Sequence, residues 1–148
     1  MQPATQFSVF LVNRPTVLAQ VCEALARDHV NLVAMSLMDS TEHGVMRLVT
    51  DDTAKARTSL KRLGLPTAET EVLLVELAHR PGALADVCAR LGGEHVGIHY
   101  AYCTGAAPNG RSLAVLKVSD MGKALSALDS RRPRRKVVLD RRVRVRRA

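Results

Sequence analysis

Two short loops carry residue types that could hold a small anion. The first is Asn13-Arg14-Pro15-Thr16-Val17-Leu18 and the second is His79-Arg80-Pro81-Gly82-Ala83-Leu84. Proline is typical of the first turn of a helix, where the backbone N–H groups have no intrahelical acceptor and the helix dipole is positive. Such a turn suits a carboxylate or a phosphate. Gly82 would let a ligand approach the main chain closely, whereas Thr16 offers a hydroxyl group and a bulkier wall.

The same loops admit a simpler interpretation. A turn that only joins a strand to a helix would carry the same proline and need no ligand. The two loops, however, lie at matching places in two halves of the chain, which favours a shared binding role. We predict that they hold the carboxylate of an amino acid.

Metal binding is suggested by one spacing and opposed by the structure expected there. His95, His99 and Cys103 recur every four residues, as ligands on one helical face would. They fall on a predicted strand, where four residues extend about 13 Å, too far for neighbouring residues to share a metal with bonds of about 2.0–2.3 Å. We therefore predict no metal site.

The residue types of an enzyme site form no recognisable pattern. Cys22 and Cys88 lie beside Val21 and Val87 on predicted helices, where we expect both to pack as small buried hydrophobic side chains. The sequence contains no nucleophile elbow, zinc-protease motif, or glycine loop for phosphates or dinucleotides. We predict that the protein is not an enzyme and uses no cofactor.

An internal repeat organises the chain. The loop that begins at Asn13 matches the one that begins at His79, an offset of 79 − 13 = 66. Later matches, such as Lys55 with Lys123, have an offset of 123 − 55 = 68. The two extra residues fall around residues 104–110, where glycine, proline and asparagine predict an enlarged turn.

Each copy changes its periodicity in the same order. A dense apolar strand comes first, then an amphipathic helix, two extended segments, a helix preceded by capping residues, and a last strand. The predicted strands are 7–12, 31–38, 45–50 and 68–71 in the first copy and 72–77, 96–103, 113–118 and 136–145 in the second, with helices over 15–25, 53–63, 81–91 and 121–128.

This order, βαββαβ twice, predicts an α+β fold of two ferredoxin-like modules with antiparallel sheets and helices on one face. We assign residues 5–71 to the first module and 72–148 to the second, which includes the Arg-rich C-terminal segment 131–148. The first strand of each copy should be central, because its sequence is apolar on both faces.

The sequence resembles the ACT-domain family, specifically proteins made of two tandem ACT modules. The likeness spans residues 6–128. It rests on Asn13-Arg14-Pro15-x-x-Leu18 and Arg80-Pro81-Gly82-x-Leu84 after the first strands, and on Val30-Asn31-Leu32 and Val96-Gly97-Ile98 at the entry to the second strands.

The resemblance implies a function and a set of site residues. Family members typically bind amino acids and related ligands where the first loop of one module meets the start of the second strand of a neighbouring module. Such a protein would act as a regulator or sensor, through oligomerisation or through a regulated enzyme partner. The implied ligand contacts are residues 13–18 and 79–84 in the loops, and Asn31-Leu32 and Gly97-Ile98 in the second strands.

The resemblance also implies that the two sites differ. Asn31 could form a hydrogen bond with an α-amino or α-carboxylate group, but Gly97, its counterpart, has no side chain to do so. Conversely, Thr16 stands where the family favours the glycine that is kept at Gly82. One kind of site would therefore be weaker or silent.

The positive charge is concentrated at one end. The formal net charge is +8, and residues 131–148 hold nine Arg, one Lys and one Asp, so the remaining 130 residues carry 8 − 9 = −1. The alternative function is therefore nucleic-acid binding through this Arg-rich segment. Sequence-specific RNA binding is unlikely in our interpretation, because Tyr100 and Tyr102 share a strand face without forming an RNA-binding aromatic run.

Compartment and assembly follow from general features. The apolar run Phe7–Val12 is far shorter than a membrane span. The three cysteines include no CxxC pair and do not suggest a secreted disulfide framework. We therefore expect a cytoplasmic protein without membrane contact. Leu32, Val33, Met35 and Leu37 give the second strand an apolar character that predicts association between sheets, and hence a homodimer.

Overall fold

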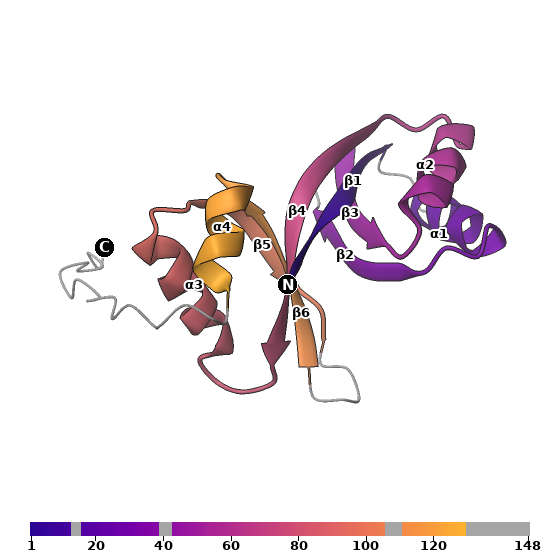
Figure 1. Cartoon of the computed structure of the whole chain (residues 1–148). Coiled ribbons are helices and arrows are strands. Elements are labelled where there is room, and N and C mark those ends of the chain that lie inside the picture. The colour runs from indigo at the N-terminus through magenta and orange to yellow at the C-terminus, as the bar shows by residue number, and fades with distance from the viewer. Residues whose placement is uncertain (13–15, 39–42, 106–110, 130–148) are drawn as a thin grey trace, which may run out of the picture.

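The computed structural model describes residues 1–12, 16–38, 43–105 and 111–129. The elements in this part follow the predicted order, except that the predicted strands 68–71 and 72–77 form one continuous strand, because no turn interrupts the extended chain between them. The predicted strand 136–145 lies outside the described residues. No helix among the described residues is long and apolar enough to cross a membrane. The elements in Figure 1 are β1 (Gln2–Val12), α1 (Val17–Arg27), β2 (Leu32–Met38), β3 (His43–Thr50), α2 (Thr53–Arg62), β4 (Thr67–Ala78), α3 (Ala83–Gly93), β5 (Ile98–Cys103), β6 (Arg111–Val118) and α4 (Met121–Leu128).

The strands form one antiparallel sheet that runs through both modules. Its order is β2-β3-β1-β4-β6-β5, so β1 and β4 are central, as their apolar sequences predicted. The fold is the predicted α+β arrangement of ferredoxin-like modules. The modules are thus joined edge to edge through shared hydrogen bonds.

β1 and β4 each contribute to both modules. The second half of β1 and the first half of β4 pair within the first module. The first residues of β1, Gln2–Ala4, lie beside Val72–Leu74 of the second module. This is the place of the fourth strand in a ferredoxin-like module. In the second module this place is taken by the N-terminal residues of β1, Gln2–Ala4. The predicted module boundary between residues 71 and 72 falls inside β4, and remains a prediction.

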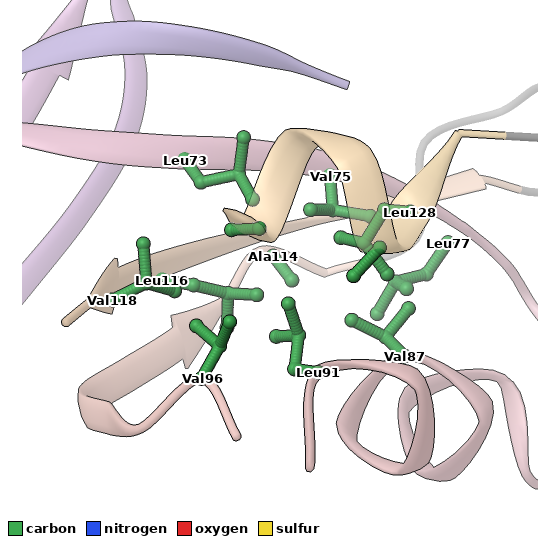
Figure 2. Packing of buried hydrophobic residues seen from close by; sticks show 12 residues of the cluster. Leu73, Val75, Leu77, Val87, Leu91, Val96, Ala114, Leu116, Val118 and Leu128 are labelled. Atoms are coloured by element: carbon green, nitrogen blue, oxygen red, sulfur yellow. The ribbon is translucent and has the colours of Figure 1, made fainter. Parts of the chain in front are cut away.

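All four helices pack against the same face of the sheet. In the ladder Pro3 is opposite Leu73 and Phe7 is opposite Glu69, so Phe7 and Leu73 project from the same side. Phe7 lies in the core under α1 and α2. Leu73 lies in the core under α3 and α4, and Figure 2 shows this second core. Figure 1 shows the two helix pairs at opposite ends of the molecule, with β1 and β4 between them.

Equivalent helices begin and end alike. After α1 and α3, His29 and His95 adopt left-handed backbone angles, with φ of 56° and 55°. The next residue in each case donates its N–H to the helix carbonyl five residues earlier, as in a Schellman motif. At α2 and α4, the carboxylates of Asp52 and Asp120 accept from the backbone N–H three residues later. The repeat is therefore preserved at the level of individual backbone contacts.

The face opposite the helices, which we call the helix-free face, is strongly curled. A flat sheet would separate β3 from β5, four strand positions away, by about 19 Å. The guanidinium of Arg47 on β3 lies 4.6 Å from the ring centroid of Tyr100 on β5, which two side chains that stand perpendicular to a flat sheet could not achieve. A small core on this face joins both modules; it contains Ala34, Val49, Val72, Leu74 and Val115.

The repeat predicts matched costs for matched core truncations. Leu25 and Leu91 occupy equivalent positions on α1 and α3, and both are fully buried. We expect Leu25→Ala and Leu91→Ala each to lower the free energy of unfolding by about 2–5 kcal/mol, because each leaves a cavity in one module core. Urea unfolding monitored by circular dichroism measures the change. Leu84→Ala, at a partly exposed side chain on α3, is the control; an equal loss there would contradict the assigned cores.

Candidate functional site

The loop after β4 presents the start of α3 to solvent. Gly82 is the N-cap, with φ of 85° in the left-handed region, and accepts the N–H of Asp86 at 2.9 Å. Arg80 folds over this turn and donates to the Asp86 carboxylate, Nη2 to Oδ2, at 2.6 Å. The remaining first-turn N–H groups of α3 have no intrahelical acceptor. One of them, the Ala83 N–H, donates to the Arg80 carbonyl at 3.3 Å. That this loop binds an anion stays a prediction.

The loop after β1 differs at the one position that can be compared. Residues 13–15 lie outside the described part of the chain. Thr16, the N-cap of α1, has a right-handed backbone with φ of −95°, and its side chain forms no capping hydrogen bond. It is exposed, as is Gly82. The substitution of threonine for glycine is therefore accompanied by a different backbone conformation.

The start of β2 has a polar pair that sequence reasoning missed. Asp51 accepts from the backbone N–H of Asn31 at 2.9 Å and from its side-chain amide at 3.1 Å. The amide oxygen of Asn31 and the carboxylate of Asp51 are both acceptors in an exposed place. The signal was present in the sequence, because Asp51 directly follows β3, but the residues before the next helix were interpreted only as capping residues.

The start of β5 lacks this charge. The backbone N–H of Gly97 donates to the Ser119 hydroxyl at 2.9 Å, and Ser119 N–H donates back to the Gly97 carbonyl. Ser119 corresponds to Asp51, since 119 − 51 = 68. A hydroxyl therefore replaces a carboxylate, and the second-strand half-sites differ in charge as well as in side chain.

Within each module the loop and the second strand lie at opposite ends of the sheet. Ala78, before the second loop, is opposite Arg111 on β6, whereas Ile98 is opposite Val118. The seven residue steps from Arg111 to Val118 on β6 span about 23 Å. The same separation holds in the first module, where β1 ends opposite His43 and β2 begins opposite Thr50. The predicted contacts of one module are therefore not brought together.

The helix-free face holds a polar group that was not predicted, which we call the tyrosine cluster (Gln6, Arg47, Tyr100 and Tyr102). The amide of Gln6 is fully buried, donates to the Tyr100 hydroxyl at 2.8 Å and accepts from the Tyr102 hydroxyl at 3.0 Å. Burial raises the pKa of Tyr102 above its usual value, and the nearby Tyr100 adds to this shift. Both hydroxyls are thus engaged inside the protein, which opposes a role of these rings in RNA binding.

The cysteines and histidines behave partly as expected. Cys22 packs against the first core, but Cys88 is exposed, so the prediction that it is buried was wrong. The reason is that Val87 and Leu91 face the sheet, which turns Cys88 to the solvent side of α3. Among the residues that the structure describes, no group of His, Cys, Asp or Glu could hold a metal ion.

Two shallow hollows flank the ion pair between Arg57 on α2 and Glu69 on β4. Their volumes are about 420 and 390 Å³, and Glu69 lines both. Arg57 donates to both oxygens of Glu69, at 2.6 and 2.8 Å, which lowers the pKa of that carboxyl and raises the pKa of Arg57. Neither hollow contains a residue of the predicted ligand site.

Comparison with known proteins agrees with this architecture. A family model described as an ACT domain pair matches residues 3–127. The chain belongs to this family. The crystal structure of protein BT0572 from Bacteroides thetaiotaomicron is 33% identical, with a TM-score of 0.79, and the match covers 85% of this chain and 86% of that one.

More distant structural neighbours share the fold. The regulatory subunit of aspartate kinase from Thermus thermophilus, in a ligand-free form, is 13% identical with a TM-score of 0.63, over 86% of this chain and 95% of that one. Its counterpart from Thermus flavus is 17% identical with a TM-score of 0.59, over 86% and 91%. A search of the curated proteins found no match.

The left-handed backbone at Gly82 predicts a cost for any side chain there. We expect Gly82→Ala to lower the free energy of unfolding by about 1–2 kcal/mol, because a Cβ is strained at this φ. Gly92→Ala is the control, since Gly92 is helical and its added Cβ would meet no atom within 4 Å; it should stabilise by up to about 1 kcal/mol. Thermal unfolding of both variants measures the difference. A Gly82→Ala protein as stable as the parent would refute the left-handed turn.

Proposed function

We propose that this protein binds an amino acid or a related small ligand and acts as a regulator or sensor. The observation that carries the proposal is the opposite character of the two kinds of half-site. The start of α1 offers N–H groups that no side chain of its N-cap Thr16 covers, which suits a carboxylate, and the Asn31–Asp51 pair offers acceptors for an ammonium group. An α-amino acid carries both groups, so the two half-sites together complement it.

A second copy of the chain is needed to join these half-sites. β1 and β2 are parallel to each other, because both pair antiparallel with β3. If β2 pairs antiparallel with β2 of a second copy, Asn31 of the partner subunit lies beside Met38, at the end of the sheet where the first loop begins. A homodimer of this form would contain two such sites related by a two-fold axis.

The edge of β2 supports this mode of association. Within the described part of the chain, no strand pairs with the outer side of β2. The strand contains neither proline nor a charged residue, the features that usually protect an edge from pairing. Its exposed side chains are Leu32, Val33, Met35, Leu37 and Met38. On β5, the other edge, the exposed positions carry His99, Ala101 and Cys103, which are smaller or more polar.

The partner we propose is a regulated enzyme. Two structural neighbours are, by name, regulatory subunits of aspartate kinase, and this chain shares their fold. Ligand binding at an interface between copies would change assembly by mass action, and an enzyme bound to one assembly state would sense the ligand. The Arg-rich segment 131–148, on which nucleic-acid binding would depend, lies outside the described residues.

Amino-acid binding should depend on Asp51. We expect calorimetric titration with the individual proteinogenic amino acids to detect binding by at least one of them. Asp51→Asn should weaken it about ten- to a hundredfold, because it removes the charge opposite the ammonium group. Ser119→Ala, at the equivalent place in the second module, is the matched control and should bind normally. Absence of both heat and thermal stabilisation with every amino acid would refute the proposed function.

The dimer should depend on the β2 edge and not on the β5 edge. We expect Met35→Lys to shift the protein from dimer to monomer in sedimentation equilibrium, because it places a charge in the proposed apolar contact. Ala101→Lys is the matched control, since 101 − 35 = 66 places it at the same position of the repeat. A parent protein that is monomeric, or a dimer lost only in the Ala101→Lys variant, would contradict this interface.

A further inference from the structure

The tyrosine cluster connects β1 and β3 of the first module with the edge strand β5 of the second module. Arg47 comes from β3, Gln6 from β1, and Tyr100 and Tyr102 from β5, so its contacts cross the helix-free face rather than follow the sheet. The modules are also joined by the small core of this face and by the ladder between β1 and β4, which can twist and bend. The angle between the modules therefore depends on these side chains.

The hydrogen bonds of the cluster form only when the face is curled. The fully buried amide of Gln6 has a tyrosine hydroxyl at each end, and its nitrogen also donates to Ser8 at 3.3 Å. Moving β5 away would remove both tyrosine partners at once. A buried amide without partners is unfavourable, so these hydrogen bonds favour the curled arrangement for as long as the amide stays buried.

Arg47 is the most easily displaced member of the cluster. Its guanidinium lies over the Tyr100 ring and contacts the sulfur of Met38. Among the residues that the structure describes, no carboxylate is within ion-pair distance of it, although Arg57, Arg62, Arg80 and Arg111 each have one. A carboxylate binds guanidinium more strongly than a ring face or a thioether does. An anion that reached Arg47 would therefore compete with Tyr100.

Arg47 is also close to the proposed ligand site. Met38, which it contacts, is the last residue of β2 and lies at the end of the sheet where the first loop begins. We propose that Arg47 transmits ligand binding between the modules: the carboxylate of a ligand bound at the end of β2 draws Arg47 away from Tyr100, and the angle between the modules opens. This inference rests on the proposed function and adds the way in which binding is sensed at the β5 edge.

The angle can be measured by pulsed electron spin resonance between one label on each helix layer. The native Cys88 on α3 is exposed and takes one label, and Gln20→Cys on α1 takes the other, in a background with Cys22→Ala and Cys103→Ser. Without ligand, we expect one narrow distance distribution, and Arg47→Met should shift or broaden it. Arg57→Met, which removes an arginine from a contact within the first module, is the matched control and should leave it unchanged. An unchanged distribution in the Arg47→Met protein would overturn the role of the cluster.

The ligand arm separates this inference from the proposed function. Each amino acid that gives heat in the titration is added to the labelled protein, and we expect it to shift the distances in the Arg47 protein and not in Arg47→Met. Binding heat without any distance change would overturn transmission while amino-acid binding stands. No heat with any amino acid would overturn the proposed function and transmission together, and the ligand-free comparison would still decide whether Arg47 sets the angle.

Discussion

The antiparallel ladder between β1 and β4 is the contact on which the rest of the structure depends. Each of these strands is longer than one module needs, and each supplies hydrogen bonds to both. A module of about 70 residues buries too little surface to be stable by itself, and here the two are made one unit by a shared sheet. The position of every candidate site relative to the others follows from this ladder.

The shared sheet has two consequences for binding. It separates the two edge strands, β2 and β5, and no other strand of the described residues pairs with their outer sides. It also leaves the loop and the second strand of each module at opposite ends, so that neither module contains a whole site. In the proposed function, a site that depends on two copies would link ligand binding to assembly, and this link would be the physical basis of regulation.

Divergence between the copies gives the two halves different chemistry. The second loop keeps Gly82 in a left-handed turn, while the first has Thr16 in a right-handed one. The starts of the second strands also differ: beside β2 the first module has the carboxylate of Asp51, whereas beside β5 the second module has the hydroxyl of Ser119. The helix-free face then connects both halves through Gln6 and Arg47, whose environment combines residues far apart in the chain.

Four features could be predicted from the sequence: the repeat, the order of elements, the central place of β1 and β4, and the start of α3 at a glycine turn. Each can be recognised from local patterns of residue types along the chain. The exposure of Cys88, the Asn31–Asp51 pair and the tyrosine cluster could not. They depend on how the helices face the sheet and how far the sheet curls, which are sums of many small packing and twist effects. The sequence by itself therefore determined the modules and their family, whereas only the tertiary structure decided that the modules share a sheet and that its curl brings Arg47 onto Tyr100.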